Sequence, residues 1–85
     1  MRQAPEFFES EELDLIFIAK KLKEALKIED LLTEAGIDYA VEPDTYRGGL
    51  IFASERIGAF FYVPPSASEQ AKQVLSAHRY KPYEI

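Results

Sequence analysis

The sequence contains no cysteine, a single histidine and only four glycines among its 85 residues. The absence of cysteine excludes disulfide frameworks, thiolate zinc sites and cysteine nucleophiles together. Small secreted domains commonly depend on disulfides, so a cysteine-free chain of this size is expected in the cytoplasm. No apolar run approaches the roughly 18 residues of a membrane-spanning helix, and Pro5, Glu6 and Glu9 do not suit a signal peptide. The membrane is therefore not an expected partner.

Positive charge is also scarce, because ten lysines and arginines are outnumbered by fifteen acids and the net charge is −5. A polyphosphate repels a chain of this charge, so nucleic acid is not an expected partner. Lys20, Lys21, Lys23 and Lys27 form a local basic cluster, with Glu24 among them. This interleaving is typical of a solvated helix face with i,i+4 ion pairs.

Residues that could form a catalytic set are few. His78 has no nucleophile, base or metal ligand at helical spacing, which is typical of a histidine at a helix end or on the surface. Glu29 and Asp30 would point about 100° apart on a helix, so their carboxyls would not converge. Glu42 and Asp44 supply too few oxygens for calcium. We therefore expect no enzymatic activity, no metal and no cofactor.

What the chain does have is a globular composition, with 47% hydrophobic and 13% aromatic residues. Its length allows one domain, which we place at residues 13–85. Residues 1–12 lack clean periodicity and are expected to form a flexible N-terminal arm. Phe7 and Phe8 would either anchor this arm on the core or remain free for a partner.

Apolar patterning predicts the secondary structure. The expected strands and apolar runs are 13–21, 38–43, 50–53 and 59–64, with turns at 44–49 and 54–58 and helices at 23–37 and 66–80. Gly36 suits a left-handed helix cap, because glycine lacks the Cβ that penalises this conformation. Ser66 and Glu69 have the spacing of a capping box for the second helix.

This order, β-α-β-β-α, predicts an α+β fold of the ferredoxin-like, split βαβ type. Two amphipathic helices would cover one face of an antiparallel sheet and leave the other face open. The tail, residues 81–85, would either form a short edge strand beside the first strand or simply pack.

Two segments of the chain carry a resemblance to a known family. The stretches "AKKLKEALKIEDLLTEAGIDYAV" and "GAFFYVPPSASEQAKQVLSA" resemble small bacterial signal-transducing domains grouped with the PII-like fold. The likeness covers about residues 13–78 and implies a regulatory role, but it assigns no site residues. The N-terminal arm and the segment "YRGGLIFASERIG" depart from the family pattern.

The loop around "YRGG" is the strongest candidate for a ligand site. Backbone N–H groups at Gly48 and Gly49 could form an anion-binding nest, and Arg47 could pair with a phosphate or carboxylate. Arg56 would lie nearby and add positive charge. The loop lacks the Gly-Lys-Ser/Thr element of a phosphate-binding Walker loop. Gly-Gly is also ordinary turn chemistry, so a plain turn remains the alternative.

A second candidate is an interaction surface rich in aromatic residues: Tyr46, Phe52, Phe60, Phe61 and Tyr62. Along a strand Phe60 and Tyr62 share one face, and Phe61 points the other way. An aromatic patch on the open face would favour a contact between copies of the chain. Core packing and base stacking on RNA are the alternatives, and the thin basic surround weakens the latter.

These features favour a non-enzymatic regulatory or interaction module. It would associate through the open sheet face, with the loop from Tyr46 to Ile57 touching a protein partner, a second copy or a small anion. The alternative is a sensor of the PII kind that binds a nucleotide or metabolite through Arg47, Gly48 and Gly49.

Overall fold

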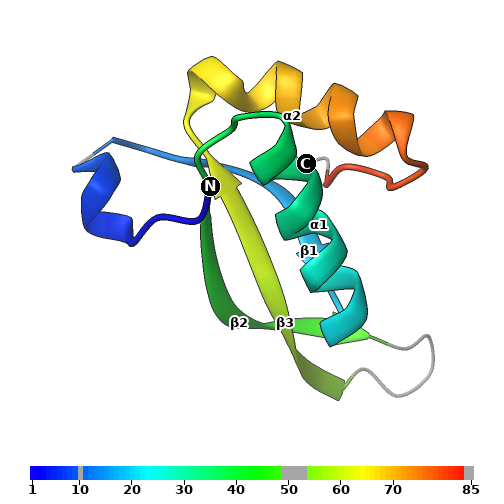
Figure 1. Ribbon diagram of the computed structural model, residues 1–85. Helices are drawn as coiled ribbons and strands as arrows, with labels where there is room; N and C mark the ends of the chain where they lie inside the picture. The colour runs from blue at the N-terminus through cyan, green and yellow to red at the C-terminus, as the bar shows by residue number, and fades with distance from the viewer. Residues whose placement is uncertain (10, 49–53, 84–85) are drawn as a thin grey trace.

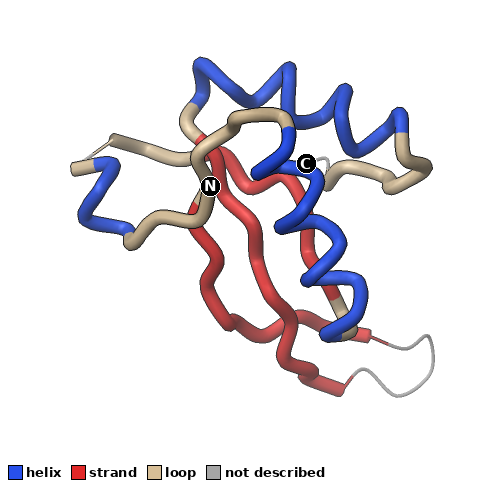
Figure 2. Tube along the Cα trace, in the orientation of Figure 1, coloured by secondary structure: helices blue, strands red, loops and turns tan. Residues whose placement is uncertain are grey.

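The computed structural model describes residues 1–9, 11–48 and 54–83 (Figure 1). Three strands and two α-helices follow a short 3-10 helix, so the fold is α+β (Figure 2). The elements, in chain order, are the 3-10 helix Pro5–Phe8, β1 Asp14–Ala19, α1 Leu22–Glu34, β2 Ala40–Gly48, β3 Ser54–Val63 and α2 Pro65–Ala77.

The strands form one antiparallel sheet in the order β1-β3-β2. Because β1 and β2 both run antiparallel to β3, they run parallel to each other with β3 between them. β1 pairs with β3 only as far as Ala19, which lies opposite Ala59. β2 and β3 continue past this point as a two-stranded ribbon that reaches Gly48 and Ser54.

This ribbon corrects two predictions. The segments 44–49 and 54–58 were expected to form turns, but Asp44–Gly48 and Ser54–Gly58 pair along the whole ribbon. Residues such as Thr45, Tyr46 and Ile57 suit a strand, and their pairing across the ribbon outweighs the local turn preference of the glycines. The apolar run predicted at 50–53 lies outside the described residues.

Helix α1 is held on the sheet by the apolar stripe of Ala25, Ile28, Leu31 and Leu32, all of which are buried. It ends at Glu34, with Ala35 at the C-cap. Gly36 follows with a φ of +73°, its N–H donates to Thr33, and the N–H of Ile37 donates to Leu32. This pair of bonds is the Schellman arrangement, so the predicted glycine cap is confirmed.

Helix α2 begins differently from the prediction. Pro65 is its first residue, and Pro64 stands at the cap position without a side-chain hydrogen bond. Ser66 therefore lies within the first turn, and the predicted capping box with Glu69 is wrong. The fixed φ of proline suits the first helical position and replaces the cap as the start signal.

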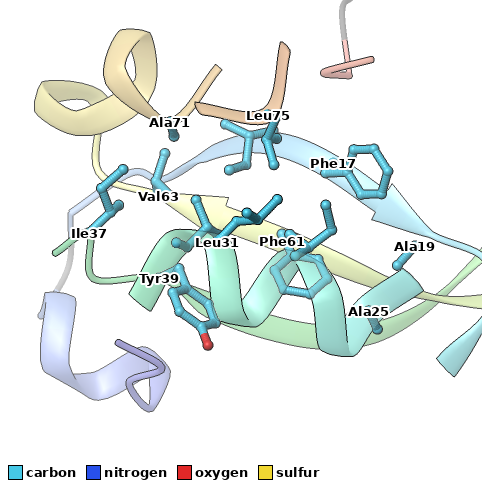
Figure 3. Close-up of a cluster of buried hydrophobic side chains, with 13 residues drawn as sticks. Phe17, Ala19, Ala25, Leu31, Ile37, Tyr39, Phe61, Val63, Ala71 and Leu75 are labelled. Atoms are coloured by element: carbon cyan, nitrogen blue, oxygen red, sulfur yellow. The ribbon is translucent and has the colours of Figure 1, made fainter. Parts of the chain in front are cut away.

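The core lies between the two helices and one face of the sheet (Figure 3). Phe61 and Val63 of β3 are fully buried there, against side chains of α1 and of α2 such as Leu31 and Leu75. Both helices therefore cover the same face of the sheet.

Both ends of the described chain lie against the sheet. Gln3 donates a backbone hydrogen bond to Tyr39 at 2.8 Å, and Tyr39 donates one to Met1 at 3.1 Å. Of the two phenylalanines in the predicted arm, Phe8 is buried at 6% exposure, whereas Phe7 is 55% exposed. In the tail, the N–H of Tyr83 donates to Ile16 of β1 at 2.7 Å, and residues 80–83 form no strand of their own.

Candidate interaction surface

The register of the sheet places a second set of side chains on the face away from the helices. Residues directly opposite each other in a sheet share a face. Phe60 pairs with Ile18 of β1 and with Glu42 of β2, and the next row places Tyr62 opposite Leu15. The surface that we call the open face contains Leu15, Ile18, Glu42, Asp44, Phe60 and Tyr62.

Exposure on the open face is uneven. Tyr62, Ile18 and Leu15 are half-buried, and Phe60 is only 8% exposed because its neighbours shield it. Phe61 points the other way, as its position in the strand predicts, and is fully buried in the core. Phe61 therefore cannot belong to the predicted interface, and Phe60 contributes mainly as a support beneath its neighbours.

One corner of the open face depends on a glycine. A Cβ built on Gly58 would lie 3.0 Å from Cε1 of Tyr46, 3.1 Å from Cγ2 of Ile18 and 3.1 Å from the carbonyl oxygen of Ala19. The ring of Tyr46 thus lies directly across the backbone of β3. Nζ of Lys20 stands 5.3 Å from the centroid of this ring, within cation–π range.

Negative charge lies on the β2 side of the open face. Glu42 and Asp44 are exposed there. Burial raises the pKa of Tyr62, and the negative charges of Glu42 and then Asp44 raise it further. The negative charges of the two carboxylates are therefore felt by the hydroxyl of Tyr62 on the same face.

Positive charge lies on the β1 side. Lys20 and Lys81 line a hollow of about 470 Å³ together with Ile18, Phe60 and Tyr46. Both lysines are exposed. The open face thus has acids along one edge, lysines along the other, and partly exposed apolar side chains between them.

The predicted anion loop receives no support from the backbone. Arg47 and Gly48 lie in β2 and pair with Glu55 and Ser54, so Gly48 is extended and not curled into a nest. Gly49 lies outside the described residues, as does Phe52 of the aromatic set. Arg56 is exposed and lies opposite Tyr46 on β3.

The remaining chemical candidates stand apart from the open face. His78 is exposed at the end of α2. Glu29 accepts a hydrogen bond from the hydroxyl of Tyr39 at 3.0 Å, whereas Asp30 is exposed. Within residues 1–9, 11–48 and 54–83, no group of three or more His, Asp or Glu side chains could hold a metal ion. The described helices are also too short and too polar to cross a membrane.

Comparison with known proteins leaves the chain without an assigned family. No family model matches it, and no curated protein or solved structure matches it either. The resemblance to bacterial signal-transducing domains therefore stays a prediction. The open face has to be interpreted from its own geometry.

Sequence reasoning missed most of this surface, and Ile18, Lys20 and Gly58 show why. Ile18 belongs to an unbroken apolar run, which gives no alternation from which its face could be inferred. Gly58 lies two residues before the aromatic run of β3, and a glycine inside a strand is a signal of close backbone approach that could have been used. No local signal relates Lys20 to Tyr46, because the sheet alone brings them together.

Proposed function

We propose that the chain is a non-enzymatic interaction module that pairs with a second copy of itself through the open face. The observation that carries the proposal is the placement of both helices on one side of the sheet. On the other side Leu15, Ile18 and Tyr62 are partly exposed, and no described helix or strand covers them. A partly apolar, aromatic surface of this kind favours a protein contact.

The charges favour a second copy as the partner. A two-fold axis in the interface, parallel to β3, sets β2 of one copy over β1 of the other. Glu42 and Asp44 of each copy then lie over the side that carries Lys20 and Lys81 of the other. Complementary charge of this kind fixes the orientation of the partners and disfavours wrong ones.

The dimensions of the molecule leave room for a stable interface. The molecule measures 39 × 29 × 23 Å, so its broad sides are 39 by 29 Å. A stable interface buries roughly 800 Å² on each partner. Pairing over most of one broad side would provide this area.

We further propose that the chain has a ferredoxin-like fold and a regulatory role. The strand order suits a ferredoxin-like plait in which a fourth strand would lie beside β1, where the tail already bonds to Ile16 through Tyr83. A regulatory role is what the resemblance to signal-transducing domains implies. An anion sensor based on Arg47, Gly48 and Gly49 stays a prediction without a favouring observation.

Size-exclusion chromatography with light scattering at tens of micromolar tests the pairing. We expect twice the mass of the 9.7 kDa chain. Tyr62→Ser should weaken the dimer about tenfold or more, because the ring is a partly exposed aromatic anchor on the central strand of the face. Glu42→Lys and Lys81→Glu should each weaken it, and the double variant should recover much of the loss, because the charge pattern is again complementary.

Ile57→Ser is the matched control, because Ile57 is 74% exposed on the other side of the sheet. It should leave the dimer intact. A monomeric mass at this concentration, or a dimer that Tyr62→Ser and the charge variants do not change, would refute the proposal. Circular dichroism of each variant separates loss of pairing from loss of fold.

A further inference from the structure

A cleft of about 290 Å³ lies on the helix side of the sheet, where the first turn of α1 stands beside the β2–β3 ribbon. The helices pack on β1 and β3, and Figure 1 shows the lower part of the β2–β3 ribbon reaching past the first turn of α1. The floor of the cleft is apolar and consists of Ala25, Val41, Pro43 and Ala59.

Two aliphatic side chains form the walls of the cleft. Leu22 opens α1 and is 75% exposed, and Ile57 of β3 is 74% exposed. These are the largest exposed fractions among the large hydrophobic side chains of the described residues. Covering this apolar floor and its two walls would be favourable, because it removes apolar surface from water.

The rim of the cleft is positive. Arg2 and Lys21 line it, and no carboxylate does so among the described residues. Lys20 also borders the cleft, but its Nζ lies over the Tyr46 ring on the open face. Arg2 lies 3.9 Å from Glu29, but its side chain remains 60% exposed. A concentrated positive rim is notable in a chain with a net charge of −5.

The charges at the two ends of α1 do not stabilise the helix. The helix dipole favours acids at the first turn and bases at the last. α1 has lysines at 20, 21 and 23 around its start, Glu24 as the one acid of its first turn, and no base in its last turn. The lysines therefore oppose the dipole, and helix stability does not explain their position.

We infer that this cleft binds a peptide segment of a partner protein in which a bulky apolar side chain is flanked by carboxylates. The apolar side chain enters between Leu22 and Ile57 and covers the floor. The flanking carboxylates meet Arg2 and Lys21 at the rim. Arg2 can hold a carboxylate through two parallel N–H bonds, whereas Lys21 acts as a point charge.

The volume of the cleft limits what can occupy it. Ligand pockets commonly measure roughly 300–1,000 Å³, so this cleft is at the small end and suits one side chain better than a nucleotide. The partner is therefore a protein segment, and the contact is one small anchor with a charged surround.

Fluorescence anisotropy with the dye-labelled peptide GDEFDEG tests the inference on the full chain. We expect saturable binding with a dissociation constant on the order of 100 μM, weakened by added salt. The peptides GNQFNQG, without acids, and GDESDEG, without the aromatic ring, should each bind at least about fivefold more weakly.

Variants locate the binding in the cleft. Leu22→Ser, Ile57→Ser and Lys21→Glu should each weaken binding about fivefold or more, because each alters a wall or the rim. Leu26→Ser is the matched control, since Leu26 lies on the same helix, is 53% exposed and does not line the cleft. Lys81→Glu, which tests the dimer of the open face, should also leave peptide binding unchanged.

Three outcomes would overturn the inference. Equal binding of GDESDEG would show general attraction to positive charge, and no binding of GDEFDEG would remove the site. Binding that Leu22→Ser and Ile57→Ser leave unchanged would place it elsewhere.

Discussion

Gly58 occupies a position at which an added Cβ would lie only 3.0–3.1 Å from three neighbouring atoms. Its missing side chain lets the Tyr46 ring approach the backbone of β3 closely, and Nζ of Lys20 lies 5.3 Å from the centroid of this ring. The corner of the open face is therefore shaped by one absent Cβ. A Cβ at position 58 would crowd three atoms, and the carbonyl oxygen of Ala19 is the one that can move least, because it belongs to the backbone.

We expect Gly58→Ala to lower the free energy of unfolding by about 1–3 kcal/mol, the usual range for forcing an extra carbon into a packed site. Urea denaturation measures the change, and the NMR shifts of the Tyr46 ring report its displacement. Gly36→Ala is the control, because the space around Gly36 is open and only its φ of +73° is penalised. It should cost stability without moving Tyr46. A stability-neutral Gly58→Ala would contradict the packing described at this corner.

At the scale of elements, β1 shows how an unbroken apolar run divides between two faces. The register shifts between Leu15 and Phe17, and this bulge leaves Ile16 without a partner in the ladder. Ile16 and Phe17 are both buried in the core as a result, whereas Leu15 and Ile18 are half-buried on the open face. An alternating pattern could not have produced two successive core residues.

The division within β1 predicts unequal effects of truncation. Ile16→Ala should lower the free energy of unfolding by about 2–5 kcal/mol, because a fully buried side chain leaves a cavity. Leu15→Ala should cost clearly less, since solvent already reaches that side chain. Urea denaturation of the two variants checks the order, and equal losses would mean that the bulge does not select the core residue.

The elements also show where sequence reasoning succeeds. The stripe of α1 and its cap at Gly36 depend on neighbours in the chain, so both could be predicted. The β2–β3 ribbon could not, because the pairing of residues such as Tyr46 with Arg56 outweighs local turn chemistry. The start of α2 was misplaced because Pro65 and Ser66 both resemble start signals, and proline determined the outcome.

At the scale of the whole molecule, the α+β class follows from the order of the elements, and the opposite directions of Phe60 and Phe61 follow from alternation in a strand. The surfaces themselves depend on how elements meet. The cleft exists because α1 begins beside a ribbon that outruns β1, and neither the length of the ribbon nor the position of Ile57 could be read from the sequence.

Tyr39 connects three parts of the molecule. Its backbone bonds to Met1 and Gln3, its hydroxyl donates to Glu29 of α1, and its ring lies 5.9 Å from that of Phe61 in the core. Burial raises the pKa of Tyr39 above the ordinary value of 10.0, and the hydrogen bond to Glu29 also acts to raise it. The folded protein therefore holds this proton more firmly than the unfolded chain does.

This proton makes stability depend on alkaline pH. Below pH 10 both states keep it, and Tyr39 adds no pH dependence; above pH 10 the unfolded chain releases it first, so the free energy of unfolding falls as pH rises. Tyr39→Phe should lower the free energy of unfolding by about 1 kcal/mol at neutral pH, because the hydrogen bond to Glu29 is lost. Between neutral pH and pH above 10, the variant should lose less stability than the unsubstituted protein. Urea denaturation at neutral pH and above pH 10 measures both effects. Tyr62, whose pKa is also raised, remains in both proteins and cancels from the comparison. An equal alkaline loss in the two proteins would show that the Tyr39 proton does not link pH to the stability of the whole fold.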